Sequence, residues 1–338
     1  MKCYFCVSVS NDQESARIYG EMLEVALKSA VTNTSLDLVV VYDGPEGHYY
    51  EKIIEKYDAT IIRHSFSQVR ALPLAFPKDY LLKKYGRAVD YNKLKGTFLR
   101  LDIPDLDSSN DVVLYSDIDV VFQSSFNEDG LLQDFKYLKA GPEFSPNPKD
   151  FKYFNAGILL LNLKTIRPFT QAILKDIKQG IPNKEGLFDQ GYLNDRLFGK
   201  HDLLPLEYNW KPYWGYNSNA KIIHFHGIKP GASYHASGFG MNKEGLMACF
   251  WGRKNNLGGF LYYLEEYFSY LDMKPDKKWL MQLVNEILEI PDPSPVQVSV
   301  PLELLNKKIV FHYFVDRLKK AKRKIISNKR ITIRRTIE

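Results

Sequence analysis

The sequence contains little cysteine: three residues in 338, namely Cys3, Cys6 and Cys249. Three cysteines are too few for the disulfide framework of a small secreted domain. Cys3 and Cys6 have the spacing of half a zinc or redox motif, but no second pair follows and both lie in an apolar run. We therefore expect both residues to be buried in a strand, and the low cysteine content indicates a reducing compartment.

Long apolar runs and internal repeats are also absent. No stretch approaches the roughly 18–20 apolar residues that a membrane-spanning helix needs. The N-terminus has one lysine and a short apolar run that leads directly into polar residues 11–14, without the cleavage region of a signal peptide. The sequence therefore predicts a cytoplasmic protein without a transmembrane anchor.

Excess positive charge is confined to the C-terminal tail. The net charge is +6, but ten of the 46 Lys and Arg residues lie within residues 317–338. Acids slightly outnumber bases elsewhere, which argues against a nucleic-acid-binding fold with a basic reading face. Apolar residues recur at helical spacing among the tail's bases: Leu318, Ala321, Ile325 and Ile326. We expect a basic amphipathic segment at about 312–338 to bind an anionic membrane surface; a disordered tail and a nucleic-acid arm are the alternatives.

Apolar strand-like runs alternate with helix-length segments over the first 230 residues. This alternation predicts an α/β fold, a mostly parallel sheet with helices on both faces, whose sites lie at the carboxyl ends of strands. The Pro-interrupted segment 65–95 has the profile of an insertion lying over a site, and residues 291–301 that of a linker. Strands are expected at 4–9, 36–42, 60–63, just before Asp117, 154–163 and 221–226, and helices at 15–29, 49–57, 94–101, 165–180, 189–198 and 279–289.

Two carboxylates, Asp117 and Asp119, end the β-branched run that begins at Asp111. In an extended chain, residues two apart point to the same face, so the pair can converge where a buried strand ends. Carboxylates are hard oxygen ligands for Mg²⁺ or Mn²⁺, which in turn bind diphosphates. Asp105 and Asp107 have the same spacing, but their Pro/Ser/Asn-rich surroundings are typical of a turn. Context therefore favours the first pair.

An ordered set of motifs resembles the retaining family 8 glycosyltransferases of GT-A type. The set comprises the first strand and its loop, Arg100 in TFLRLDIP, YSDIDVVF at 115–122, FNAGILLLNL at 154–163, DQGYLN at 189–194, LPLEYNW at 204–210 and HFHGIKP at 224–230. The resemblance implies a GT-A, Rossmann-like mixed sheet flanked by helices, over residues 1–270. Residues 271–338 would then be a helical extension ending in the basic tail.

The resemblance also implies roles for individual residues. His224 would join Asp117 and Asp119 as a metal ligand, and mixed carboxylate and imidazole ligation favours Mn²⁺ over Mg²⁺. His226, on the same expected strand face, is the alternative ligand. Asn155, Asp189 and Gln190 match positions that bind the donor sugar or lie beside its anomeric carbon. Contacts to the donor nucleotide or its phosphates are expected from Ser8, Ser10, Asn11, Arg100, Ser116, Asp117, Gly227 and Lys229, although one residue fewer than in the family pattern separates Gly227 from Lys229.

The expected reaction is transfer of a hexose from a UDP-sugar to a cell-surface glycan or glycolipid, with retention at the anomeric carbon. We expect an enzyme at the cytoplasmic face of a membrane. A sugar nucleotidyltransferase would need a glycine-rich, basic first loop, and residues 8–12 contain neither glycine nor base. A non-catalytic sugar- or membrane-binding module would be expected to lose the site carboxylates, and both are present.

Overall fold

The computed structural model describes residues 1–85, 90–109, 111–126, 128–147, 153–184, 188–231, 243–290, 297–300 and 332–335. The chain divides into two compact units, residues 1–209 and 210–338. The expected domain boundary at residue 270 stays a prediction.

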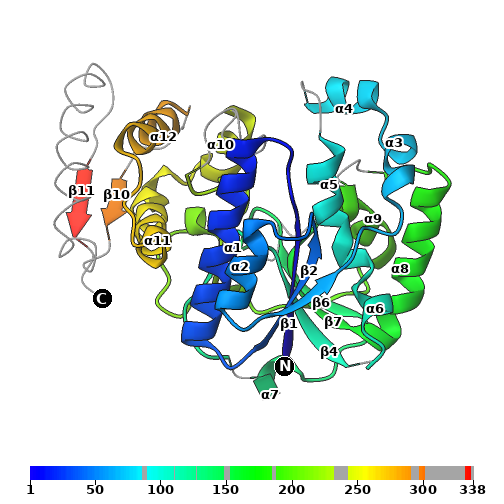
Figure 1. Ribbon diagram of the computed structural model, residues 1–338. Helices are drawn as coiled ribbons and strands as arrows, with labels where there is room; N and C mark the ends of the chain where they lie inside the picture. The colour runs from blue at the N-terminus through cyan, green and yellow to red at the C-terminus, as the bar shows by residue number, and fades with distance from the viewer. Residues whose placement is uncertain are drawn as a thin grey trace. The chain divides into compact units, whose positions relative to one another are not determined.

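The first unit is built on a seven-stranded sheet in the order β3-β2-β1-β4-β7-β6-β8 (Figure 1). β1, β2, β3 and β4 are parallel, whereas β7 is antiparallel to both β4 and β6. The sheet is therefore mixed and helices flank it, so the fold class expected from the sequence is confirmed. The strands are β1 (Lys2–Ser8), β2 (Asp37–Asp43), β3 (Thr60–Arg63), β4 (Val112–Ser116), β6 (Leu138–Pro142), β7 (Phe154–Asn162) and β8 (Asp202–Leu203).

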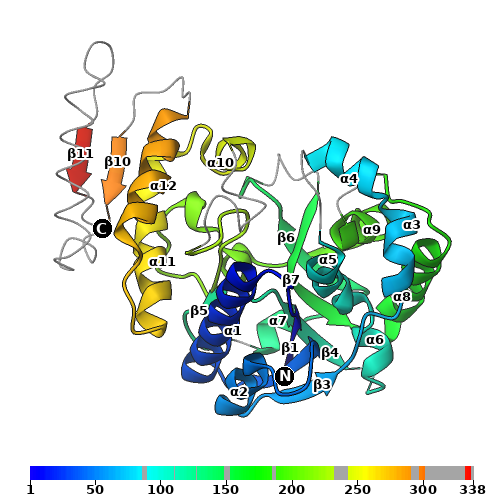
Figure 2. The same ribbon diagram turned by 45° about the horizontal axis from the view of Figure 1, so that its top comes forward.

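Both faces of the central strands are covered, which explains why they read as continuous apolar runs. On one face, Tyr4, Cys6 and Tyr115 join the core formed with α3, α5, α8 and α9. Helices α1 and α2 lie on the other face, where Phe5 contacts Phe122 edge to face (Figures 1 and 2). The helices of this unit are α1 (Gln13–Asn33), α2 (Tyr49–Lys56), α3 (Leu72–Ala75), α4 (Lys78–Tyr85), α5 (Tyr91–Phe98), α6 (Ile103–Leu106), α7 (Glu128–Leu131), α8 (Leu163–Lys178) and α9 (Phe188–Leu197).

Several side chains in the described part of the segment 65–95 belong to the core, and the expectation that this segment lies over a site stays a prediction. Phe66, Leu72 and Phe76 are fully buried in it. Phe76 packs against Phe98 of α5 and Tyr192 of α9. The prolines that suggested a loop instead begin short helices, with one in the first turn of α3.

The second unit contains β9 (Ile222–His224), α10 (Lys243–Phe250), α11 (Leu257–Tyr270), α12 (Lys277–Glu289), β10 (Gln297–Val300) and β11 (Thr332–Arg335). β10 and β11 pair in parallel, so the expected linker at 291–301 is wrong for residues 297–300, where valines alternate with polar residues. Most of the basic segment at 312–338 lies outside the described residues. None of the helices in the described part of the chain is both long enough and apolar enough to span a membrane.

Candidate functional site

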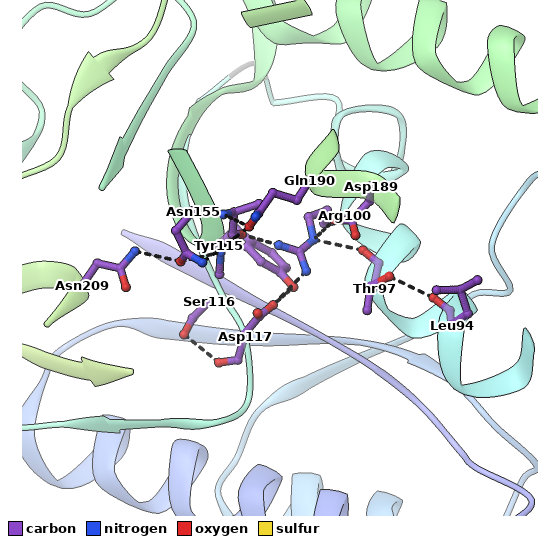
Figure 3. A network of polar contacts seen from close by, with 12 residues as sticks. Leu94, Thr97, Arg100, Tyr115, Ser116, Asp117, Asn155, Asp189, Gln190 and Asn209 are labelled. Carbon is purple, nitrogen blue, oxygen red and sulfur yellow. Dashed lines mark hydrogen bonds and ion pairs between the residues drawn. The ribbon is translucent and has the colours of Figure 1, made fainter. Parts of the chain in front are cut away.

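The candidate site forms in the first unit, where the exit of β4 meets the start of β7 and the first turn of α9. Its centre is the guanidinium of Arg100, in the 3₁₀ turn that follows α5 (Figure 3). Arg100 donates from Nε to the Thr97 carbonyl at 2.9 Å and from Nη1 to the Ala156 carbonyl. These bonds hold a buried cation at the carboxyl end of the sheet.

Two carboxylates flank this guanidinium. Nη2 of Arg100 lies 2.9 Å from Oδ1 of Asp117, and Nε lies 2.8 Å from Oδ2 of Asp189. Burial favours the neutral form of Arg100, but the charges of the two aspartates outweigh it and raise the pKa of the guanidinium above its ordinary value. Arg100 therefore stays charged and links the end of β4 to the start of α9.

Tyr115 holds the Asp117 carboxylate from a second direction. The Tyr115 hydroxyl donates to Oδ1 of Asp117 at 2.6 Å, and the Tyr115 ring lies 4.4 Å from the Arg100 guanidinium carbon. Burial, the largest cause, raises the pKa of Tyr115 well above its ordinary value. The side chain of Asp117 is 28% exposed, so a carboxylate fixed by buried donors still reaches solvent.

Asp189 has a different environment. Its side chain is only 5% exposed. Burial raises the pKa of Asp189 to about 6, against the opposing charge of Arg100. The residue before it, Phe188, has φ +50°, a left-handed conformation that is costly for a bulky side chain. Asn183 donates to the Phe188 carbonyl at 2.8 Å and supports this turn, which directs Asp189 towards Arg100.

Asn155 at the start of β7 and Gln190 in the first turn of α9 lie in contact. Oε1 of Gln190 accepts from the Ala156 backbone N–H at 2.7 Å and from Nδ2 of Asn155 at 3.4 Å. Asn155 Nδ2 also donates to Oε2 of Glu143 at 2.9 Å, and Asn155 Oδ1 accepts from Asn209 at 3.1 Å. The result is a connected set of amides and carboxylates that can bind several hydroxyl groups of a sugar.

Residues Ser8, Ser10 and Asn11 lie at the exit of β1. The Ser8 hydroxyl donates to the Asn92 carbonyl at 2.9 Å, and Ser10 accepts from the Asp12 N–H at 3.2 Å. Ser8 and Ser10 are buried, whereas Asn11 is exposed. Gly96 is required where α5 crosses this strand end, because a Cβ there would lie 2.5 Å from Ser8 Oγ. Asn11 is the most exposed of the three side chains.

Ser116 and Asp119 lie on either side of Asp117 and are both buried. Ser116 donates its hydroxyl to the Asp117 carbonyl at 2.8 Å and stabilises the turn at the end of β4. Asp119 directly precedes β5 (Val120–Phe122). Asp117 directly follows β4, and a bend at residues 118–119 leads into β5, so the two acids do not lie on one extended strand as their spacing predicted.

The second unit contains His224, His226, Gly227 and Lys229. β9 ends at His224, so the expectation that His224 and His226 share a strand face is wrong. His224 is buried, and Nδ1 of His226 is hydrogen-bonded to the Tyr213 hydroxyl at 2.9 Å. Gly227 has φ +82°, which a residue with a side chain rarely adopts, and partly exposed Lys229 follows two residues later.

Asp105 and Asp107, the other pair with the same spacing, are occupied by structural contacts. Oδ2 of Asp107 accepts from Lys2 Nζ at 2.8 Å and from the Tyr4 hydroxyl at 2.7 Å, while Oδ1 accepts from the Ser109 N–H at 2.9 Å. Asp105 lies on α6, where it accepts from Gln171 at 3.1 Å. The prediction that this pair serves a turn is confirmed at Asp107, whose bond to Ser109 closes one.

Sequence reasoning missed Tyr115, Glu143, Thr97 and Asn209 as members of this network. Tyr115 could have been found, because it lies two residues before Asp117 and so on the same strand face. Glu143 has no such signal, since its place beside Asn155 depends on the pairing of β6 with β7, which includes a register shift. Asn209 likewise contacts Asn155 only through the tertiary fold.

The model of the family described as "Glycosyl transferase family 8" matches residues 17–233. No curated protein matches the chain in sequence.

Several solved structures are similar to the chain. The apo-form glycosyltransferase GlyE of Streptococcus pneumoniae TIGR4 has a TM-score of 0.50 and 18% identity, covering 89% of this chain and 68% of its own. The galactosyltransferase LgtC, solved with donor and acceptor sugar analogs, has a TM-score of 0.48 and 18% identity, covering 83% of this chain and 100% of its own. Mouse xyloside xylosyltransferase 1 has a TM-score of 0.45 and 17% identity, covering 66% and 96%. At these identities the similarity to GlyE shows the fold.

Proposed function

The chain belongs to glycosyl transferase family 8, and we propose that it moves a hexose from a UDP-sugar to a cell-surface glycan or glycolipid in a metal-dependent reaction. The observation that carries the proposal is the buried Arg100. It joins the partly exposed carboxylate of Asp117 to Asp189, which lies beside the hydrogen-bonded amides of Gln190 and Asn155. A donor with a diphosphate at one end and hydroxyls at the other matches these two chemistries.

Asp117, Asp119 and His224 are the proposed ligands of the divalent cation. They offer carboxylate oxygens and one imidazole nitrogen, a donor set that fits Mn²⁺, with Mg²⁺ as the alternative. Asp117 fits the role because one oxygen is fixed by protein donors while its side chain is partly exposed. A bound cation would supply Lewis-acid neutralisation of the negative charge on the leaving nucleoside diphosphate. That His224 rather than His226 is the third ligand stays a prediction.

The protein's own groups would bind and orient the donor. Asn155, Gln190 and Glu143 offer amide N–H groups and carboxylate oxygens to sugar hydroxyls. The positive charge of Arg100 would attract the donor's negatively charged phosphates. Lys229 would add a second positive charge beside the backbone of Gly227. Ser8, Ser10, Asn11 and Ser116 are assigned to the nucleotide end, where a uridine nucleotide is inferred from the family. Such fixed polar groups act where charge develops in the transition state.

Retention of anomeric configuration would follow a front-side course, in which the departing phosphate oxygen takes the acceptor's proton. Double displacement would need a carboxylate nucleophile on the far face of the sugar. Asp189 is held by Arg100 at 2.8 Å and is buried, which weakens it as a nucleophile, and the Gln190 amide is a poor one. Mass-spectrometric detection of a glycosyl adduct on Asp189 or Gln190 would refute this course.

We also propose that the basic tail holds the enzyme at the cytoplasmic face of an anionic membrane. The support is the concentration of ten bases in residues 317–338. Removing residues 302–338 should abolish co-sedimentation with vesicles containing 30% phosphatidylglycerol, while transfer to a soluble acceptor persists. Unchanged partitioning would refute the anchor.

The direct test is release of UDP from a panel of UDP-sugars with and without Mn²⁺. We expect metal-dependent release from at least one donor, and its loss in Asp117→Asn. Release of pyrophosphate from a sugar phosphate and UTP would instead support a nucleotidyltransferase. A folded protein that turns over no donor under any metal condition would support a non-catalytic binding module.

A further inference from the structure

Asp117 carries two hydrogen bonds on the same carboxylate oxygen. The Tyr115 hydroxyl and Arg100 Nη2 both donate to Oδ1, at 2.6 and 2.9 Å. Fixing one oxygen from two directions sets the plane of the whole carboxylate, because its two oxygens rotate together. The backbone is also held, since the Asp117 N–H donates to the Gly157 carbonyl at 2.6 Å. The orientation of Asp117 is therefore determined before any ligand arrives (Figure 3).

Tyr115 is itself a rigid support. It is 1% exposed, lies in the middle of the sheet between β1 and β7, and has its ring against the Arg100 guanidinium. Its hydroxyl therefore has little freedom to leave Asp117. The proposed reaction gives Tyr115 no direct contact with the donor, the acceptor or the cation.

We propose that Tyr115 is a positioning residue that aims the Asp117 carboxylate at the divalent cation and thereby sets the affinity for metal. This inference rests on the proposed function, because it takes Asp117 as a ligand. Hydrogen-bond partners of metal-binding carboxylates orient them and raise their affinity, and removing one typically costs about 10–100-fold in metal binding or activity.

The chain contains a matched control for this hydrogen bond. Tyr4 on β1 lies directly opposite Tyr115 in the sheet register, is 2% exposed, and donates to a buried aspartate, Asp107, at 2.7 Å. Tyr4→Phe and Tyr115→Phe each delete one oxygen from one strand and leave the ring in place. The two variants should lose similar stability, but only Tyr115→Phe removes a bond to a proposed metal ligand.

The experiment measures Mn²⁺ affinity of the full-length protein without donor, by electron paramagnetic resonance titration of free Mn²⁺, together with thermal unfolding. We expect Tyr115→Phe to weaken Mn²⁺ binding about 10–100-fold. Tyr4→Phe should bind like the wild type, and Asp117→Asn should lose binding. In steady-state assays, Tyr115→Phe should need correspondingly more Mn²⁺ for half-maximal rate and approach the wild-type rate at saturating Mn²⁺.

Two outcomes would overturn the inference alone. One is Mn²⁺ binding by Tyr115→Phe equal to wild type while Asp117→Asn loses it, which would leave the proposed metal site standing. The other is an equal weakening in Tyr4→Phe and Tyr115→Phe, which would assign the effect to general stability. A wild-type protein that binds no Mn²⁺, with or without UDP, would overturn both the inference and the metal-dependent function.

Discussion

The first unit contains two Asp-x-Asp triplets of identical spacing, and the structure uses them in opposite ways. Asp107 is 6% exposed, and both of its oxygens accept hydrogen bonds from the protein. Asp117 is 28% exposed in its side chain, and the two donors described above share one oxygen. Asp107 connects β1 to the segment before β4 through its hydrogen bonds, whereas the Asp117 carboxylate lies just after β4 and is partly exposed to solvent.

The lesson is that the spacing of two acids does not define a metal site. What matters is whether solvent, and with it a cation, reaches the carboxylate. A carboxylate saturated by a lysine, a tyrosine and a backbone N–H would have to give up those bonds to bind a cation.

The largest expected effect is on catalysis. Asp117→Asn should reduce transfer by about 10²–10³-fold or more, since it removes a proposed ligand of the cation that would neutralise the leaving group. Asp107→Asn, the matched change in the other triplet, should leave the rate per folded molecule within about threefold, because Asp107 contacts no site residue. Initial rates of UDP release at saturating donor would test both. An equal loss of rate in the two variants would remove the distinction between the triplets.

The next effect concerns Asp189, which lies on the other side of the Arg100 guanidinium from Asp117. Because the pKa of Asp189 is raised to about 6, the stability linked to its protonated form is present below its ordinary pKa of 3.8 and is lost as pH rises towards 6. In the metal-free protein, the wild type should lose this stability as pH rises from 4 to 7, whereas Asp189→Asn should not. The unfolding free energy of Asp189→Asn relative to wild type should therefore increase across this range by up to roughly 3 kcal/mol. Urea unfolding across this range would measure it. A pH-independent difference would contradict it.

Asp107 should show the opposite sign. Burial alone would raise its pKa, but hydrogen bonds from Lys2, Ser109 and Tyr4 hold the pKa well below its ordinary value. The stability from Asp107 is therefore present above pH 3.8 and is lost as pH falls below it. Asp107→Asn should cost about 2 kcal/mol at pH 7, limited by the exposure of Lys2, and less at pH 3. A cost that grows on acidification would be inconsistent with this reading.

The smallest expected effect is on donor binding, and it tests whether Glu143, the hydrogen-bond partner of Asn155, belongs to the site. Glu143→Gln keeps an oxygen for Asn155 but removes a charge, so we expect the KM for the donor to rise about 3–10-fold with little change in stability. Glu51→Gln is the control, because Glu51 is also a hydrogen-bonded glutamate but pairs with Arg63 on the other side of the sheet. Donor titrations would compare the two, and a KM rise in Glu51→Gln alone would reverse the assignment.

Much of the fold could be read from the sequence because the central strands are apolar on both faces. The expected strand at 60–63 was correct to the residue, and those at 4–9, 36–42 and 154–163 were displaced by at most two residues. The core role of residues in the segment 65–95 was not visible in the sequence, because Phe66, Leu72 and Phe76 are separated by polar residues and prolines. Only packing against α5 and α9 shows that they belong to the core.

At the site, the sequence by itself determined the residues whose chemistry depends on local spacing. Asp117 and Asp119 lie in the short connection between β4 and β5, and Asp189 and Gln190 lie in the first turn of α9, because residues so close in sequence stay close in space. Tertiary structure alone decided that Arg100 bridges Asp117 and Asp189, that Glu143 lies against Asn155, and that Asp107 is closed off by Lys2 and Tyr4. The physical reason is that these contacts join residues from 12 to 105 positions apart, so they depend on sheet register and helix packing. No pattern along the chain encodes them.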